Sequence, residues 1–371
     1  MPKNLSVLLA SAACTIALAS APALSYADSF IQTNLVSDIP GLANNTDPNL
    51  KNPWGVSFTP TSPFWTSDQA TGLATLYNAS GAPQGLIVTI PGSPTPPTGP
   101  TGTVFNAAAT GFNVNGAKAT FIFDNLNGTI SAWNGGAAAT VEATTPGAIY
   151  TGLAQNAAGT LLYAANSNTN GSIDVFNSLW APTTVPGGFI DPNAIAGFVP
   201  FNIQSIGSNL FVTYARLGPG GVAMPGGYVD EFDANGNFIK RIATGGSLFA
   251  PWGLTLAPAN FGSFSNDLLI GNFGNGEILA YDATTDMFLG TLNGIDGNPI
   301  VNGNLWSLET RTGGTFNPNA VYFSAGINDQ KDGLFGELTE VPEPATIFGT
   351  ASGLIALALS GIRRKLPSRP R

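Results

Sequence analysis

Histidine is absent from this chain of 371 residues, and cysteine occurs once, at Cys14. The lack of histidine excludes a Ser-His-Asp triad, a Cys-His pair, a zinc site of the usual His/Cys type and histidine acid–base chemistry. One cysteine cannot form an intramolecular disulfide, and a domain of this length does not need one. Any chemistry must therefore come from carboxylates, amides, hydroxyls or arginine.

Charge is scarce and mostly negative. Residues 28–340 hold 7 Lys and Arg against 21 Asp and Glu, which gives a net charge of −14. Nucleic acid and anionic membrane surfaces are therefore disfavoured as partners, because binding them needs clustered cations. The negative charge favours solubility and keeps copies of the protein apart.

The first residues have the pattern of a secretory signal peptide. Lys3 precedes a mostly apolar run over 5–19, and Ser25-Tyr26-Ala27 offers a small-x-small cleavage site. We therefore expect residues 1–27 to be removed by signal peptidase after export through the Sec machinery, so that the mature protein begins at Asp28. Ala21-Pro22-Ala23 is a second possible site.

The last residues, 341–371, have the pattern of a membrane-inserted tail. An uncharged apolar run over 345–362 is followed by a basic tail, 363–371, that contains Arg363, Arg364 and Lys365. A helix of 18 residues covers roughly 27 Å of a hydrocarbon core about 30 Å thick. The basic cluster would stay cytoplasmic. The sequence predicts a transmembrane helix over 345–362, with residues 28–340 outside the cytoplasm.

Between these segments, a β-rich unit recurs every 48 to 53 residues, and helical periodicity is nearly missing. Each unit begins with an apolar strand, at 54–58, 103–105, 151–153, 201–203, 252–256 and 305–308. Second and third strands follow at matching distances. The sixth unit lacks a fourth strand, which residues 30–36 can supply by pairing with 334–338. The fold predicted for 28–340 is all-β, a six-bladed β-propeller closed by its N-terminal strand. A β-sandwich and a solenoid are the alternatives.

Polar residues recur in the turns between second and third strands. The candidates for a binding site at the channel mouth are Asp68, Asp124, Asn125, Asn166, Arg216, Asn272 and Asp329. A ring of carboxylate and amide oxygens is suited to Ca²⁺, so Asp68, Asp124, Asn125, Asn166 and Asn272 are also candidate calcium ligands. The alternative is that these residues only cap turns through their own backbone.

Three tryptophans, Trp54, Trp252 and Trp306, recur at one position of the unit. We expect them to pack between blades, and stacking on a sugar is the alternative role. A Gly/Pro-rich excursion, 217–227, is expected on one face of the propeller, either as a binding loop or as an inert insertion.

The C-terminal motif resembles a known sorting signal. Val341, Pro342, Glu343 and Pro344, followed by the apolar run and the basic cluster, are similar to the PEP-CTERM signal of Gram-negative bacteria. That resemblance implies processing by an exosortase and release to the cell surface or the medium after transient anchoring in the inner membrane. An ordinary C-terminal anchor is the alternative.

The propeller region also resembles known families. Asn52-Pro-Trp-Gly55, Val104-Phe105-Asn106 and Gly333-Leu-Phe-Gly336 are similar to a family of secreted bacterial propellers that often carry PEP-CTERM tails. In blade count the chain resembles the SMP-30-like lactonases, whose ligand motif it does not match. The predicted function is a non-catalytic surface or matrix protein that binds polysaccharide or protein. The alternative is a calcium-dependent hydrolase or lactonase.

Overall fold

The computed structural model describes residues 29–92 and 99–341. The predicted signal peptide (1–27), the apolar span (345–362), the basic tail (363–371) and the sorting motif beyond Val341 lie outside the described residues. Within the described ranges, no helix is long and apolar enough to cross a membrane.

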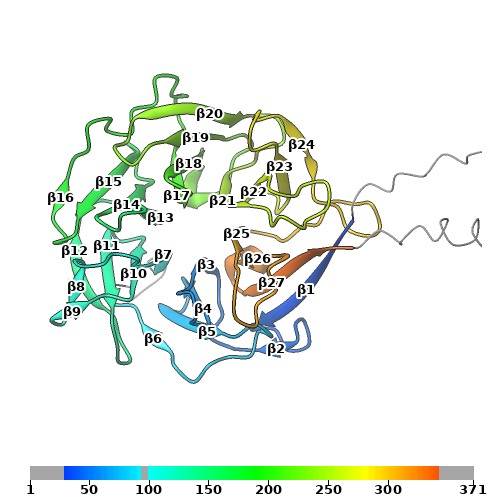
Figure 1. Cartoon of the computed structure of the whole chain (residues 1–371), viewed down its shortest axis with the longest axis horizontal. Coiled ribbons are helices and arrows are strands. Elements are labelled where there is room, and N and C mark those ends of the chain that lie inside the picture. Colours follow the sequence, from blue (N-terminus) through cyan, green and yellow to red (C-terminus); the bar gives the residue numbers. More distant parts are fainter. Residues whose placement is uncertain (1–28, 93–98, 342–371) are drawn as a thin grey trace, which may run out of the picture.

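Six sheets stand as blades around a central axis (Figure 1). In each blade the first strand of the unit lies innermost and the following strands pair outward, all antiparallel except the outermost pair of blade 6, which is parallel. Short strands separated by Gly- and Asn-rich turns favour this arrangement over helices. The prediction of an all-β, six-bladed propeller is confirmed.

The first three blades come from residues 53–183. Blade 1 contains β3 (Pro53–Ser57), β4 (Phe64–Asp68), β5 (Leu73–Tyr77) and β6 (Val88–Thr89). Blade 2 contains β7 (Pro100–Phe105), β10 (Phe121–Asn125), β11 (Thr129–Trp133) and β12 (Thr140–Thr144), with a side hairpin of β8 (Asn113–Val114) and β9 (Ala117–Lys118). Blade 3 contains β13 (Tyr150–Gln155), β14 (Leu161–Asn166), β15 (Ser172–Asn177) and β16 (Pro182–Thr183).

The last three blades complete the ring. Blade 4 contains β17 (Val199–Ile206), β18 (Asn209–Ala215), β19 (Tyr228–Phe232) and β20 (Phe238–Thr244), with a 3₁₀ turn, η1 (Pro219–Gly221). Blade 5 contains β21 (Pro251–Leu256), β22 (Leu268–Asn272), β23 (Ile278–Tyr281) and β24 (Phe288–Thr291). Blade 6 contains β25 (Leu305–Thr310), β26 (Ala320–Ala325), β27 (Leu334–Glu340), β1 (Phe30–Ser37) and β2 (Asn45–Thr46), with the short helical turn α1 (Ile327–Gln330).

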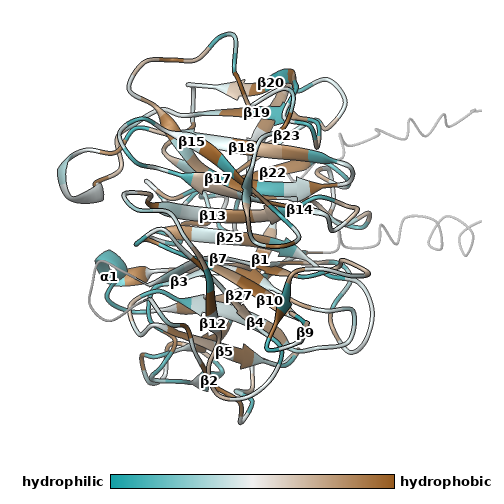
Figure 2. Ribbon diagram, turned by 90° about the vertical axis from the view of Figure 1, so that its left-hand side faces the viewer, coloured by the Kyte–Doolittle hydropathy of each residue, from teal (hydrophilic) through white to brown (hydrophobic). Residues whose placement is uncertain are grey.

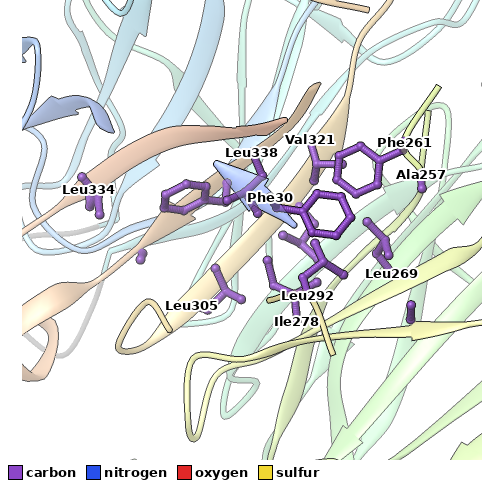
Figure 3. Close-up of a cluster of buried hydrophobic side chains, with 14 residues drawn as sticks. Phe30, Ala257, Phe261, Leu269, Ile278, Leu292, Leu305, Val321, Leu334 and Leu338 are labelled. Atoms are coloured by element: carbon purple, nitrogen blue, oxygen red, sulfur yellow. The ribbon is translucent and has the colours of Figure 1, made fainter. Parts of the chain in front are cut away.

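The N-terminal strand closes the ring. β1 pairs antiparallel with β27, with Phe30 opposite Glu340 and Ser37 opposite Leu334. Figure 3 shows Phe30 in a buried cluster with Leu338 of β27, Val321 of β26 and Phe261, which follows β21. Burial of such a side chain stabilises the fold by about 1.5–3 kcal/mol. The predicted closure is confirmed, which also excludes the sandwich and the solenoid.

Most of the hydrophobic core lies between blades, and hydrophobic residues concentrate in the strands (Figure 2). In β10, Phe121 and Phe123 pack with Trp65 of blade 1, whereas Ile122 packs with Leu153 of blade 3. Successive side chains of a strand point to opposite faces, and both faces of a blade are covered by its neighbours. This explains why the second strands are almost continuously apolar.

The innermost strands approach one another very closely. One equivalent position of the inner strands directly follows Trp54, Thr101, Thr151, Phe201, Trp252 and Trp306. It holds Gly55, Gly102, Gly152, Asn202, Gly253 and Ser307. A Cβ at Gly102 would lie 2.4 Å from the backbone nitrogen of Leu153 in the next blade, and one at Gly253 would lie 2.3 Å from the carbonyl oxygen of Trp306. Glycine is therefore needed at Gly102 and Gly253, because a Cβ there would overlap the backbone of the next inner strand.

Candidate binding site at one end of the central channel

An aromatic plug fills one end of the central channel. It consists of Trp54, Phe201, Trp252, Phe273 and Trp306, all 5% exposed or less. The Trp54 and Trp306 rings stack with centroids 3.5 Å apart, and the Phe273 and Trp306 centroids lie 4.3 Å apart. The three tryptophans therefore pack against one another from blades 1, 5 and 6, as expected, and they do so at the channel axis. They occupy the inner-strand position that faces the channel.

The predicted excursion lies at this same end of the channel. Leu217 and Ala223 pack against the plug from outside, together with Phe249. The turn α1 projects from the same face, at the left of Figure 2. We call this face the plug face.

A cavity of about 290 Å³ occupies the channel beyond the plug. It is lined by the later residues of five inner strands, β3, β7, β13, β17 and β25, and by Trp252 of β21. Trp252 and Asn202 form its inner end. The cavity opens on the face opposite the plug face, which we call the open face.

The cavity lining combines polar and apolar groups and contains one acidic side chain and no basic one among the described residues. Its amides come from Gln155, Asn156, Asn202 and Gln204, and its hydroxyls from Ser57, Thr103, Ser205 and Ser307. Among the described residues that line it there is no lysine or arginine, and Glu309 is the one carboxylic acid. Phe58 and Phe105 add aromatic surface at the outer end of the inner strands.

Glu309 is held by an amide from another blade. Gln204 Nε2 of blade 4 donates to Glu309 Oε1 of blade 6 at 3.2 Å. Burial raises the pKa of Glu309 to about 8, and the bond from Gln204 only partly opposes that shift. The carboxyl group therefore carries its proton at neutral pH and presents both a donor and an acceptor to the cavity.

The nearest cation along the strand, Arg311, does not enter the cavity. Its guanidinium packs on the rings of Phe316, Phe58 and Phe64, with its Cζ atom 3.5 Å from the Phe316 centroid. Its Nη2 donates to the carbonyl oxygens of Thr59 and Ser62. Burial lowers the pKa of Arg311 to about 10. Arg311 thus ties the loops of blades 1 and 6 together and leaves Glu309 without a counter-ion.

The residues that the sequence predicted for the site do not line this cavity. Most of them stand at the ends of second strands, and these ends pair with the first residues of the inner strands. Asp68 pairs with Pro53, Asn125 with Pro100 and Asn272 with Pro251. These positions are on the plug face, and their side chains are buried. The structure therefore differs from the prediction of an open channel mouth: the aromatic plug fills that end.

Asp68 belongs to a network between blades 6 and 1. Its carboxylate accepts from Thr66 Oγ1 at 3.1 Å and from Thr75 Oγ1 at 2.7 Å. Thr75 also bonds Tyr77, whose hydroxyl donates to Asp47. Burial raises the pKa of Asp68 well above its usual value, opposed by the two threonine hydroxyls. These contacts indicate that Asp68 has a structural role, which is to hold the interface between blades 6 and 1.

Asp124 and Asn125 point to opposite sides of β10, since they are neighbours in a strand. Asp124 Oδ1 accepts from Thr101 Oγ1 at 2.7 Å and from the backbone N–H of Gly102. Burial raises the pKa of Asp124 to about 6. Asn125 donates to the carbonyl oxygen of Thr129 at 3.5 Å. Asp124 and Asn125 cannot face one ion.

Asn166 and Asn272 organise loops. Asn166 Oδ1 accepts from the backbone N–H of Ile149 at 3.0 Å, and its amide donates to Asp174 Oδ2 at 3.1 Å. Asn272 accepts from the N–H of Phe249 at 3.0 Å and donates to Ser247 O at 2.9 Å. Both side chains therefore cap turns by bonding the backbone of neighbouring loops.

Arg216 and Asp329 are exposed on the plug face. Arg216 lies over the ring of Phe198, 5.5 Å from its centroid, and Asp329 faces Lys331 at 4.0 Å. Asp329 follows Asn328 in a left-handed turn, with φ of 56° and 55°. The structure brings neither residue to the channel cavity.

The five candidate calcium ligands thus do not converge. Each is bonded within its own interface or loop. Over residues 29–92 and 99–341, no three His, Cys, Asp or Glu side chains gather closely enough to hold a metal ion.

Sequence reasoning missed Glu309 and Gln204. The repeat could have indicated both residues. Glu309 stands three positions after Trp306, and Gln204 stands three positions after Phe201. Ser57 occupies the same position after Trp54. Polar residues at the outer ends of otherwise apolar inner strands indicate a polar channel end.

Sequence comparison gives distant relatives of viral origin. No model of a known protein family matches the chain. One uncharacterized protein of Acanthamoeba polyphaga mimivirus is 29% identical over 323 residues, covering 82% of this chain and 78% of the viral protein. A second is 28% identical over 326 residues, covering 82% of this chain and 84% of its own length.

These relatives overturn the resemblance to secreted bacterial propellers with PEP-CTERM tails. The motifs that carried it, such as Asn52-Pro-Trp-Gly55, lie where the chain turns into an inner strand. Asn52 takes a positive φ of 46° there, and Gly55 meets the neighbouring blade. The propeller fold itself requires such residues, so they do not identify one family.

Solved structures share the fold at low identity. A PQQ-bound aldose sugar dehydrogenase from Streptomyces coelicolor matches with a TM-score of 0.53 and 14% identity, over 85% of this chain and 99% of that one. A protein of unknown function from Bacteroides thetaiotaomicron matches with a TM-score of 0.54 and 12% identity, over 85% and 77%. These similarities extend to the propeller architecture alone.

Proposed function

We propose that this chain is an exported, non-catalytic binding protein that holds a neutral carbohydrate unit in the channel cavity. The observation that carries the proposal is the cavity lining: amides, hydroxyls and one carboxylic acid, with no cation. The signal-like segment 1–27 supports export.

A neutral ligand suits the charge of the cavity. An anionic ligand would need lysine or arginine, and none lines the cavity among the described residues. A cationic ligand would need an ionised carboxylate, whereas burial raises the pKa of Glu309 to about 8. The site therefore attracts neither charge at neutral pH.

Hydrogen bonding suits a polyol. Amides and hydroxyls both donate and accept, as sugar hydroxyls do. Gln204 and the protonated Glu309 extend this mixed pattern, and Phe58 and Phe105 offer faces on which a sugar ring can stack. A few polar groups on a partly apolar lining are typical of small-molecule sites.

Binding is favoured over hydrolysis by the number of acids. Glycoside hydrolysis generally uses a pair of carboxyl groups that flank the bond, and the described lining holds one. Glu309 can serve as a donor to a bound sugar without any bond being broken.

Glycan microarray screening of the purified protein, followed by calorimetry on the hits, tests the proposal. We expect binding to neutral glycans, unchanged by EDTA and weakened at least about tenfold by Gln204→Ala. Arg216→Gln on the plug face is the matched control and should bind as the wild type does. Absence of binding, or binding of acidic glycans alone, would refute the proposal.

A further inference from the structure

The inner end of the cavity is fixed. The indole N–H of Trp252 donates to the carbonyl oxygen of Thr151 at 2.8 Å, and this bond joins blade 5 to blade 3 across the channel. Asn202 donates to the carbonyl oxygen of Trp252, also at 2.8 Å. Behind Trp252, the stacked rings of Trp54 and Trp306 fill the axis. A ligand that enters from the open face stops at Trp252.

At this depth the wall is closed between blades 1 and 2 and between blades 3 and 4. A Cβ at Gly152 would lie 2.1 Å from Asn202 Oδ1, and one at Gly55 would lie 2.7 Å from Thr101 O. The inner strands of these blades are therefore in direct contact. The cavity is a socket with one opening.

The socket is small. Its volume of about 290 Å³ lies just below the usual range for small-molecule sites, about 300–1,000 Å³. Glu309 stands three positions after Trp306, which at about 3.3 Å per residue places the acid roughly 10 Å along the strand from the plug. The polar groups therefore surround one short segment of ligand.

We infer that the socket recognises the terminal unit of a neutral glycan chain and rejects internal units. The inference rests on the proposed function. An internal unit is linked on both sides, so its two neighbours would need two exits, and the socket has one. A terminal unit needs only the open face for the rest of its chain.

Oligosaccharides with blocked ends test the inference. From the glycan series that the microarray identifies, linear di-, tetra- and hexasaccharides would be titrated calorimetrically, unmodified and with a bulky substituent on either end or on both. We expect affinities within about threefold across chain lengths, and a loss of at least about tenfold when one particular end is blocked. Binding that survives blocking of both ends, or that rises about tenfold with chain length, would overturn the inference.

A plugging variant tests the location. Ser205→Tyr places a ring in the lining of the socket, and Ser208→Tyr places the same ring at an exposed position on the turn beside it. The first should abolish binding and the second should leave it unchanged, with equal thermal unfolding. If neither variant affects binding, the socket assignment is wrong.

The outcomes separate the two claims. If the wild type binds no neutral glycan, the proposed function fails and the inference fails with it. If neutral glycans bind in the socket but with both ends blocked, only the inference fails.

Discussion

At the residue scale, the buried acids differ in what surrounds them. Asp68 and Asp124 each accept two hydrogen bonds from groups of the blades that enclose them, and these bonds oppose the effect of burial on their pKa values. Glu309 has one such partner, Gln204, and otherwise faces the cavity. Its carboxyl group is therefore the one that a ligand can reach.

The protonated state of Glu309 predicts a pH dependence of stability. The folded protein keeps this proton up to about pH 8, whereas the unfolded chain releases it near the ordinary pKa of 4.5. Between these values the folded state binds more protons, so the free energy of unfolding falls as pH rises from about 4.5 through about 8. Glu309→Gln should remove this part of the slope, measured by urea unfolding across that range.

Other acids add to the same trend, since burial raises the pKa of Asp230 as well, to about 6. The comparison that matters is therefore the difference between the wild type and Glu309→Gln. A difference that does not change between about pH 5 and about pH 9 would contradict a raised pKa for Glu309.

Residue roles were only partly predictable from the sequence. The turn positions of Asn166 and Asn272 were visible, and so was turn capping as an alternative to ligand binding. The sequence could not show that the end of the channel beside them is filled, because this depends on where Trp54, Trp252 and Trp306 meet in space. Strands from three blades have to converge before that contact exists.

At the element scale, the inner strands depend on glycine. Gly152→Ala would place a Cβ 2.1 Å from Asn202 Oδ1 and 2.8 Å from Asn202 Cα, so blades 3 and 4 would have to separate. We expect a loss of about 1–3 kcal/mol in the free energy of unfolding. Gly85→Ala is the control, because nothing lies within 4 Å of its Cβ. Equal stability of the two variants would contradict the close approach of the inner strands.

The pairing of β1 with β27 closes the propeller ring. Ile31 and Thr339 face each other across β1 and β27. In a Cys14→Ser background, Ile31→Cys with Thr339→Cys should form a disulfide and raise the unfolding free energy by about 2–4 kcal/mol over the reduced form. Thermal unfolding with and without reductant measures this. A bond that forms without stabilising the protein would mean that separation of β1 from β27 is not part of unfolding.

The strands themselves were predictable. Alternation of short apolar runs with Gly and Asn turns located all six inner strands, and the incomplete last unit indicated β1 as the missing strand. The family resemblance was not reliable, because residues such as Asn52 and Gly55 follow from the propeller geometry.

At the scale of the whole molecule, the two faces of the propeller differ. The plug face carries the aromatic cluster, the excursion and α1, and the open face carries the socket with Glu309 and Gln204. The net charge of −14 over 28–340 keeps copies of the protein apart, while the socket itself has no charge at neutral pH. Ligand recognition is therefore expected on one face only.

The most direct test of this account is a calorimetric titration of one neutral glycan against three proteins. These are the wild type, Gln204→Ala on the open face and Asp329→Asn on the plug face. Binding in the socket predicts that Gln204→Ala loses at least about tenfold in affinity and that Asp329→Asn matches the wild type. Loss of binding in Asp329→Asn with full affinity in Gln204→Ala would contradict it.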